Sequence, residues 1–276
     1  MYINKAQDKE LRFMFLGDYG WRGKNLTEVG NQMSAWSVSN TITASFVVCL
    51  GDNFYHDGIV IISSSSSPSS SFSTFSSFSP FSPLSGVKSV DDVQWNSTFH
   101  STFHHESLIN IPFYAILGNH DYYLIILLSY YLIILLLGNH DYHQVPQAEI
   151  DYYYLHKNSS IPIERRWVMP DHNYTAIYNF DNNTTLQVVF IDTSIIAVKE
   201  TEETDINGKW EVTPETKMNH LKWIDETLRL STADWLVVAG HYTIFSNAEH
   251  GDTQGEHHFI IIIIIIIIII NIDYQI

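Results

Sequence analysis

Four short apolar runs in this chain each end in a glycine followed by polar residues, and this repeat restricts the fold more than any other feature. The run from Phe46 to Leu50 is apolar and β-branched, which is typical of a buried strand, and Gly51, Asp52 and Tyr55 follow it. The same order recurs at Phe13–Leu16 before Gly17-Asp18, at Phe113–Leu117 before Gly118-Asn119-His120, and at Trp235–Ala239 before Gly240-His241. Open α/β sheets bind ligands at the carboxyl ends of their strands. The four blocks together therefore predict a dinuclear metal centre at one sheet edge.

Each block alone also fits an ordinary polar loop, with Tyr55 as a packing residue. A carboxylate and a phenol on one loop, as at Asp52 and Tyr55, suit a hard and highly charged cation such as Fe(III). The recurrence of the pattern favours the metal centre over four unrelated loops.

Length and composition indicate one large α/β domain with a substantial core. The chain has 276 residues, of which 45% are hydrophobic. Its net charge of −16 argues against a nucleic-acid partner, because a phosphate backbone would be repelled. Cys49 is the single cysteine, so no intrachain disulfide can form.

Taken in order, the blocks resemble those of the metallophosphoesterase superfamily. They are Asp18-Tyr19-Gly20, Gly51-Asp52-Asn53-Phe54-Tyr55, Gly118-Asn119-His120-Asp121 and Val238-Ala239-Gly240-His241. Tyr55 narrows the resemblance to the purple acid phosphatases, and Ala248-Glu249-His250-Gly251 is similar to the small tartrate-resistant type. The resemblance implies an α/β fold, an αββα sandwich with mixed sheets, whose C-terminal part is missing from this chain.

The same resemblance implies a function and a set of site residues. It predicts an acid phosphatase that hydrolyses phosphomonoesters by attack of a hydroxide held between Fe(III) and a divalent metal (Fe, Zn or Mn). Asp18, Tyr55 and a bridging Asp52 would bind Fe(III), and Asp52, Asn119 or Asn139, and His241 would bind the divalent metal. His120 or His140, together with His250, would hold the phosphate and protonate the leaving group. The alternative is a catalytically impaired relative that is truncated or derived from a mis-spliced gene model. A metallophosphodiesterase, which Tyr55 disfavours, is the weaker alternative.

Three segments interrupt the family-like sequence. A Ser-rich, low-complexity insertion occupies about 60–86, and an apolar insertion at about 122–141 separates two copies of Gly-Asn-His-Asp-Tyr. Eleven isoleucines, Ile260–Ile270, open a non-domain tail at 260–276, so a single domain is expected over 1–259. One hypothesis is that all three segments are translated non-coding sequence in a gene model.

Only one copy of the repeated motif can occupy one site. The strand before Gly118 favours the first copy, whereas the family-like continuation after Tyr142 favours the second. We favour Asn119 and His120. The family's later Gly-His-x-His loop does not occur in these 276 residues, so each metal would lack one histidine, and weak metal binding and low activity are expected.

The sequence also carries expectations about location and association. Six Asn-x-Ser/Thr sequons and the resemblance indicate a glycoprotein that is secreted or held in an acidic vesicle, although no signal peptide is visible. The apolar stretch Leu124–Leu137 is too short to span a bilayer, which needs about 20 residues. We expect a monomer with no transmembrane span.

Apolar spacing predicts the regular elements that hold the blocks. Residues 24–39 and 214–230 are expected to be helices, the second burying Met218, Leu221, Ile224 and Leu228. Tyr174–Phe180 and Leu186–Ile191 are expected to be a hairpin, and residues 1–10 are a polar lead-in.

Overall fold

The structure is a computed structural model of the chain. It describes residues 2–8, 10–39, 43–55, 86–118, 122–128, 131–137, 145–181, 184–197 and 212–241, with the backbone alone in strands β1, β5 and β6. The Ser-rich insertion up to residue 85 and the tail at 260–276 lie outside these ranges, so the predicted domain limits stay predictions.

Three of the four motif strands lie side by side in one sheet. Strands β2 (Phe13–Leu16), β3 (Phe46–Cys49), β4 (Phe113–Ala115) and β7 (Trp167–Val168) are hydrogen-bonded in that order, and all their pairings are parallel. Every residue of β3 is fully buried, as its uninterrupted apolar sequence predicts. The carboxyl ends of β2, β3 and β4 therefore meet at one edge.

The fourth motif strand belongs to a second sheet of mixed direction. Its strands, in spatial order, are β1 (Tyr2–Asp8), β8 (Tyr174–Phe180), β9 (Thr184–Phe190) and β10 (Trp235–Ala239). The β8–β9 pair is the predicted antiparallel hairpin, whereas β1–β8 and β9–β10 are parallel. The polar lead-in of the sequence thus contains a strand, β1, which its composition did not indicate.

The two sheets pack face to face through aromatic side chains. The Phe46 and Tyr178 rings stack at 4.5 Å, the Tyr178 hydroxyl donates to the Tyr114 hydroxyl at 2.7 Å, and the Tyr174 hydroxyl donates to the carbonyl of Ala115 at 2.7 Å. The hydroxyls of these three buried tyrosines are thus hydrogen-bonded, as buried hydroxyls generally require. These contacts join β3 and β4 to β8 and fix the two sheets as one body.

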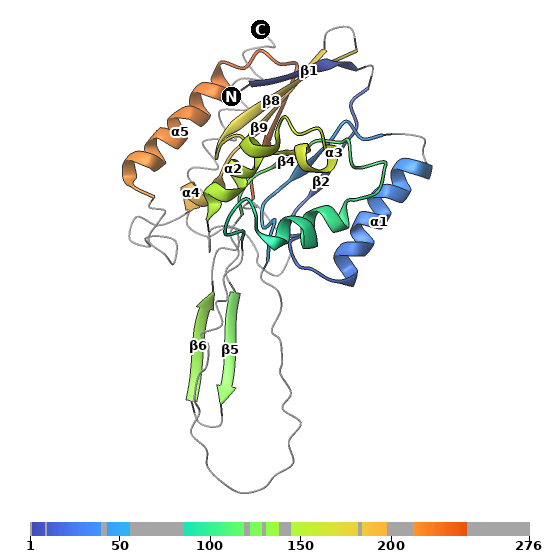
Figure 1. Ribbon diagram of the computed structural model, residues 1–276. Coiled ribbons are helices and arrows are strands. Elements are labelled where there is room, and N and C mark those ends of the chain that lie inside the picture. Colours follow the sequence, from blue (N-terminus) through green and yellow to red (C-terminus); the bar gives the residue numbers. More distant parts are fainter. Residues whose placement is uncertain are drawn as a thin grey trace, which may run out of the picture.

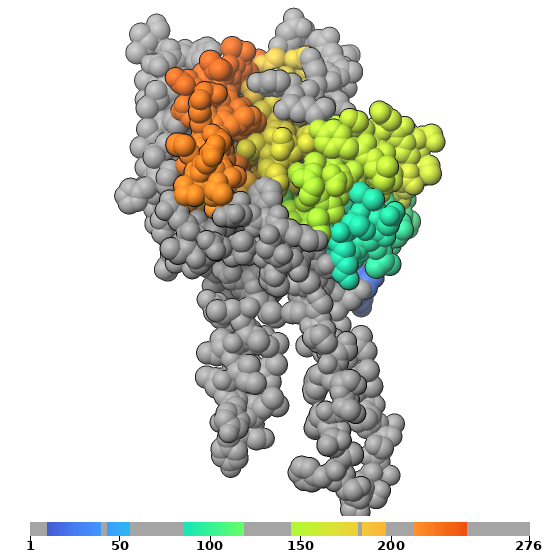
Figure 2. All heavy atoms as spheres, turned by 60° about the vertical axis from the view of Figure 1, so that its left-hand side comes forward, coloured from blue at the N-terminus to red at the C-terminus, as the bar shows by residue number. Residues whose placement is uncertain are grey.

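Helices cover both outer faces, which completes an αββα sandwich (Figure 1). On the side of the first sheet lie α1 (Lys24–Ser39), the π-helical turn η1 (Trp95–His100), α2 (Pro146–His156) and α3 (Pro162–Arg165). On the side of the second sheet lie α4 (Thr193–Ala197) and α5 (Pro214–Arg229), and Ile196, Ile224 and Leu228 pack there on Val189 and Ile191. Figure 2 shows α5, in orange, separated by the yellow segment from the α2–α3 region in lime. The predicted α/β sandwich with mixed sheets is confirmed.

The buried stripe of α5 differs from the prediction. Ile224 and Leu228 are buried and Leu221 is partly buried, but Met218 is 63% exposed and His220 is buried in its place. The Nδ1 atom of His220 lies 2.6 Å from the side-chain amide of Asn173, a partner distant in sequence that helical periodicity cannot reveal. None of the helices in the described part of the chain combines the length and the apolar character needed to cross a membrane.

The apolar insertion between the motif copies forms a separate hairpin. Strands β5 (Tyr122–Leu128) and β6 (Tyr131–Leu137) pair only with each other, from Tyr122↔Leu137 to Leu128↔Tyr131, and point away from the two four-stranded sheets (Figure 1). Tyr122 pairs with Leu137 at the open end of the hairpin, so the chain enters and leaves the hairpin at neighbouring positions.

Helix α1 rests closely on the segment after η1, which gives a first prediction. A Cβ atom on Gly30 would meet the carbonyl oxygen and side chain of Thr102 well inside contact distance. Alanine for glycine normally stabilises a helix by about 1 kcal/mol, but overpacking costs about 1–3 kcal/mol. Gly30→Ala should therefore lower the free energy of unfolding in urea by up to about 2 kcal/mol, whereas Asn31→Ala on the exposed face should not. Equal stabilisation by both variants would contradict this packing.

Candidate metal centre

Side chains from three strand ends converge where the two sheets meet. Asp18 follows β2, Asp52 follows β3 and His241 follows β10, and one potential ligand atom from each lies within 4.8 Å of the other two. Tyr55, on the loop of Asp52, joins them through its hydroxyl. The first sheet thus contributes two carboxylates and a phenol, and the second contributes an imidazole.

The backbone at this edge is held in uncommon conformations. Asp18 and Asp52 both have φ of +52°, a left-handed conformation that few non-glycine residues adopt. The loops that carry them are joined by hydrogen bonds from Asp18 N–H to the Gly51 carbonyl (3.2 Å) and from Gly20 N–H to the Asp52 carbonyl (3.1 Å). Strain of this kind persists where the surrounding structure fixes it, often at functional sites.

Two glycines allow these loops to approach. Gly51 has φ of +91°, and a Cβ there would lie 2.6 Å from the Cα of Gly118 and 2.8 Å from Nδ1 of His241. A Cβ on Gly118 would lie 2.7 Å from Oδ1 of Asp52. Any larger residue at either position would displace the loops, so the glycines of the sequence pattern are explained by close backbone contact.

Asp52 lies at the centre of the cluster and is fully buried. Its Oδ2 accepts a hydrogen bond of 2.9 Å from the Tyr55 hydroxyl, which also lies 3.5 Å from Oδ1 of Asp18. Its Oδ1 faces Nε2 of His241 at 3.6 Å and accepts no hydrogen bond from the described residues. The two oxygens of Asp52 therefore face two different groups of ligand atoms.

His241 is oriented by both sheets. Its Nδ1 lies 2.7 Å from the carbonyl of Leu50, which can only accept, so Nδ1 carries the proton and the Nε2 lone pair points toward Asp52. Its backbone N–H donates to Oγ1 of Thr193 at 3.2 Å. Asp192, beside Thr193, is buried and accepts from Ser194 N–H (3.0 Å), with His172 Nδ1 at 2.9 Å from its other oxygen. Such outer partners commonly fix the orientation of a metal-binding histidine.

The electrostatics of the cluster fit a bound cation. Burial raises the pKa of Asp52 from its ordinary 3.8 to about 8, the hydrogen bond from Tyr55 lowers it, and the charge of Asp18 raises it further. A carboxylate buried with one unsatisfied oxygen, a second carboxylate and an imidazole with its lone pair inward form a donor set for a metal ion. The residues present therefore fit a metal.

The predicted site residues fall into two groups. Asp18, Asp52, Tyr55 and His241 lie together in the structure. The others, Asn119, His120, Asn139, His140 and His250, lie outside the described residues. Thr193 and the Leu50 carbonyl, which hold His241, were not anticipated. Thr193 follows an apolar strand as the predicted ligands do, but without the glycine that marked the other blocks.

Curated proteins of similar sequence come from one group. Tartrate-resistant acid phosphatase type 5 of Mus musculus is 26% identical over 90% of this chain and 61% of its own length. The Homo sapiens protein of the same name is 25% identical over 88% of this chain and 59% of its own length, and purple acid phosphatase 7 of Arabidopsis thaliana is 26% identical over 91% and 59%. This chain spans about three fifths of the length of these curated relatives. No family model matches it.

Comparison with solved structures supports the fold. GAP50, described as the anchor in the inner membrane complex of Plasmodium, matches with a TM-score of 0.61 and 16% identity over 92% of this chain and 62% of that chain. The fold is thus that of the metallophosphoesterases. In sequence, the chain is a distant homologue of the tartrate-resistant and purple acid phosphatases.

Proposed function

We propose that this protein is a phosphomonoesterase that works with two metal ions. The observation that carries the proposal is the convergence of Asp18, Asp52, Tyr55 and His241 from strand ends of both sheets. When bound, two cations would supply an acidified water and neutralise the charge that develops in phosphoryl transfer. The protein's part is to hold the ligands at fixed positions with the carboxylate of Asp52 between them.

The contacts of Asp52 support a division of the ligands between two metals. Its Oδ2 lies with Tyr55 and Asp18, a set of hard anionic oxygens suited to Fe(III). Its Oδ1 lies with His241, which suits a divalent ion such as Fe, Zn or Mn. Asp52 would bridge the two positions. His120 or His140, and His250, would hold the phosphate and protonate the leaving alkoxide.

We propose that the first motif copy supplies the amide ligand of the divalent ion. Gly118 opens that copy and lies against Oδ1 of Asp52, and Asn119 is its next residue. Asn119→Ala should then lower divalent-metal affinity at least 10-fold, and Asn139→Ala should change it less than twofold, as measured by calorimetry. The reverse pattern would assign the site to the second copy.

A deletion provides a control for that comparison. The copies begin 20 residues apart, at 118 and 138. Removing residues 119–138 therefore joins Gly118 to Asn139 and leaves one intact Gly-Asn-His-Asp-Tyr. This merged variant should bind metal at least as well as the full chain, because β5 and β6 pair only with each other. It would lose binding if the hairpin itself supported the site.

Colour tests the assignment of Tyr55. A tyrosinate bound to Fe(III) absorbs visible light, so protein reconstituted with Fe(III) and a divalent metal should be coloured and should hydrolyse an aryl phosphate at mildly acid pH. Tyr55→Phe should remove the visible band, while Tyr154→Phe, at an exposed tyrosine on α2, should retain it. A colourless wild-type protein with a full complement of iron would refute the assignment.

A catalytically impaired relative is the second candidate. A phosphodiesterase is less consistent with the contact of Tyr55 on Asp52.

For location, we propose a secreted or acidic-vesicle glycoprotein, with a monomeric state and no nucleic-acid partner. Asn25, Asn96 and Asn158 are exposed, whereas Asn173 is partly buried and hydrogen-bonded, so glycans would attach at the first three.

A further inference from the structure

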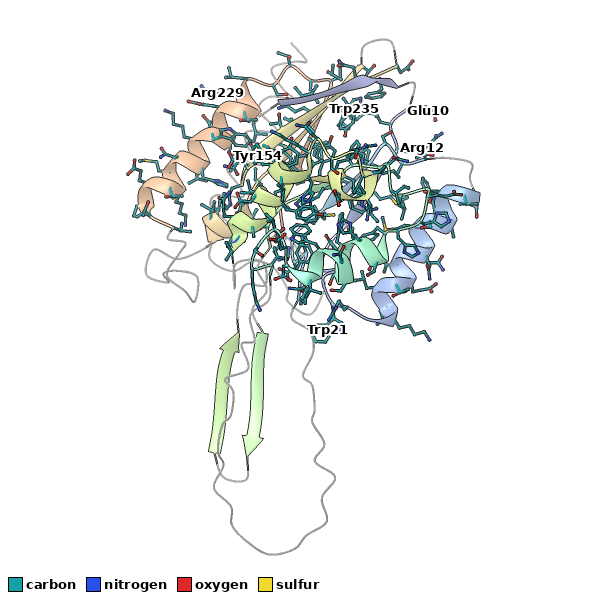
Figure 3. All side chains as sticks on the ribbon, in the orientation of Figure 1. Glu10, Arg12, Trp21, Tyr154, Arg229 and Trp235 are labelled. Carbon is teal, nitrogen blue, oxygen red and sulfur yellow. The ribbon has the colours of Figure 1, made fainter. Side chains whose placement is uncertain are left out.

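One large apolar side chain is exposed beside the metal centre. Among the described residues, Trp21, Trp36 and Trp235 are the exposed tryptophans, at 53%, 42% and 63%. The Trp21 ring meets the ring of Tyr55 edge to face, with centroids 6.2 Å apart and planes at 65°. Figure 3 shows Trp21 at the end of the body from which β5 and β6 project, whereas Trp235 lies toward the opposite end.

The backbone beneath Trp21 is fixed to the cluster. Gly20, the residue before it, donates its N–H to the Asp52 carbonyl at 3.1 Å and accepts from Tyr55 N–H at 3.2 Å. A Cβ on Gly20 would lie 2.6 Å from Cδ2 of Tyr55, so this strand end packs directly on the tyrosine ring. Trp21 is therefore an exposed ring on a rigid base, three residues from Asp18 and one aromatic contact from Tyr55.

We propose that Trp21 selects the substrate: it stacks on the leaving group of phosphomonoesters whose phosphate is esterified directly to an aromatic ring. This inference rests on the proposed phosphomonoesterase function and names its substrate class. Tyr55 reaches Asp52 through its hydroxyl and Trp21 through its ring, so Trp21 lies about one side chain away from the carboxylates. An aromatic ring bonded to the ester oxygen of a phosphate held at the cluster would stack on Trp21 in this proposal. An alkyl group has no π-face with which to stack.

The expected size of the effect follows from known aromatic contacts. Aromatic pairs contribute about 0.5–1.5 kcal/mol beyond the area they bury, which corresponds to about a 2- to 12-fold change in a dissociation constant. About half of the Trp21 side chain already faces solvent, so this surface is available to a ligand. Preference for the aryl ligand should be of this order.

Non-hydrolysable ligands test the inference without depending on turnover. Binding of phenylphosphonate and of methylphosphonate to metal-loaded protein is measured by calorimetry, and quenching of tryptophan fluorescence is followed in parallel. The wild-type protein should bind phenylphosphonate about 5-fold more tightly than methylphosphonate. Trp21→Ala should reduce that ratio to about 1, Trp21→Phe should keep most of it, and Trp235→Ala, the matched exposed tryptophan, should leave it unchanged.

Asp52→Ala separates failure of the inference from failure of the proposed function. If both phosphonates bind through Asp52 but the ratio is the same in wild type and Trp21→Ala, the role of Trp21 is wrong and the phosphomonoesterase proposal stands. If neither phosphonate binds, or if binding survives Asp52→Ala, the role of Trp21 and the phosphomonoesterase proposal are both wrong. A fall in the ratio in Trp235→Ala as well would also overturn the inference, since the effect would not be local to the site.

Discussion

Replacing Asp52 by asparagine should weaken metal binding at both positions and, at the same time, make the metal-free protein more stable at pH 8. Asp52 is the residue whose two oxygens face both groups of ligand atoms, so its loss affects both metal positions. Loss of an outer partner alone costs about 10–100-fold in affinity or activity. We therefore expect the affinity for Fe(III) and for the divalent ion to fall more than 100-fold, as measured by metal content and calorimetry.

The effect on the metal-free protein has the opposite sign because the carboxyl group is buried. Burial raises the pKa of Asp52 to about 8. Between pH 4 and 8 the Asp52 carboxyl group is therefore ionised in the unfolded chain but protonated in the folded protein. Folding then takes up a proton, and stability falls as pH rises through this range. Each pKa unit is worth about 1.36 kcal/mol, so the cost at pH 8 is on the order of 5 kcal/mol. Asparagine is neutral and avoids this cost.

The test is urea unfolding of metal-free protein at pH 4 and pH 8. The wild type should lose stability over this range relative to Asp52→Asn, and the two should be nearly equal at pH 4. Asp91→Asn, at an exposed position, is the control and should follow the wild type. Added metal should stabilise the wild type and Asp91→Asn but not Asp52→Asn. If metal-free Asp52→Asn is less stable than wild type at pH 8, interactions within the protein must stabilise the buried carboxylate without a metal, and the prediction is wrong.

The sequence allowed the metal centre to be anticipated because its geometry follows from strand direction. Asp18 and Asp52 come from adjacent parallel strands, whose carboxyl ends must meet, and the apolar runs before them identify those strands. Strand β1 was missed because its sequence is polar on both faces, so nothing in its pattern marks pairing through the backbone. His220 and Thr193 were missed for a related reason. Their partners, Asn173 and His241, are 47 and 48 residues away, and periodicity reports only on local neighbours.

Adding a Gly-His-x-His segment should increase the phosphatase activity of the 276-residue chain by more than any single substitution would. On the family pattern each metal would take one further imidazole from such a loop, and the 276 residues contain none. Four described ligands and one asparagine would otherwise hold two ions. Loss of a residue that binds the metal directly should cost more than the roughly 10–100-fold cost of losing an outer partner, and here such losses fall on both metals. The unmodified 276-residue chain is therefore expected to bind metal weakly and turn over slowly.

The experiment compares three polypeptides in hydrolysis of a chromogenic aryl phosphate at mildly acid pH. The first is the unmodified chain. The second removes the Ser-rich insertion and residues 119–138 and replaces Ile260–Ile270 with a segment ending in Gly-His-x-His. The third carries alanine at both added histidines, so it controls for the removal of apolar sequence, which by itself should reduce aggregation. The second should exceed the other two at least 100-fold in kcat/KM. Rapid turnover by the unmodified chain, lost in Asp52→Ala, would instead mean that its own residues already complete both coordination shells.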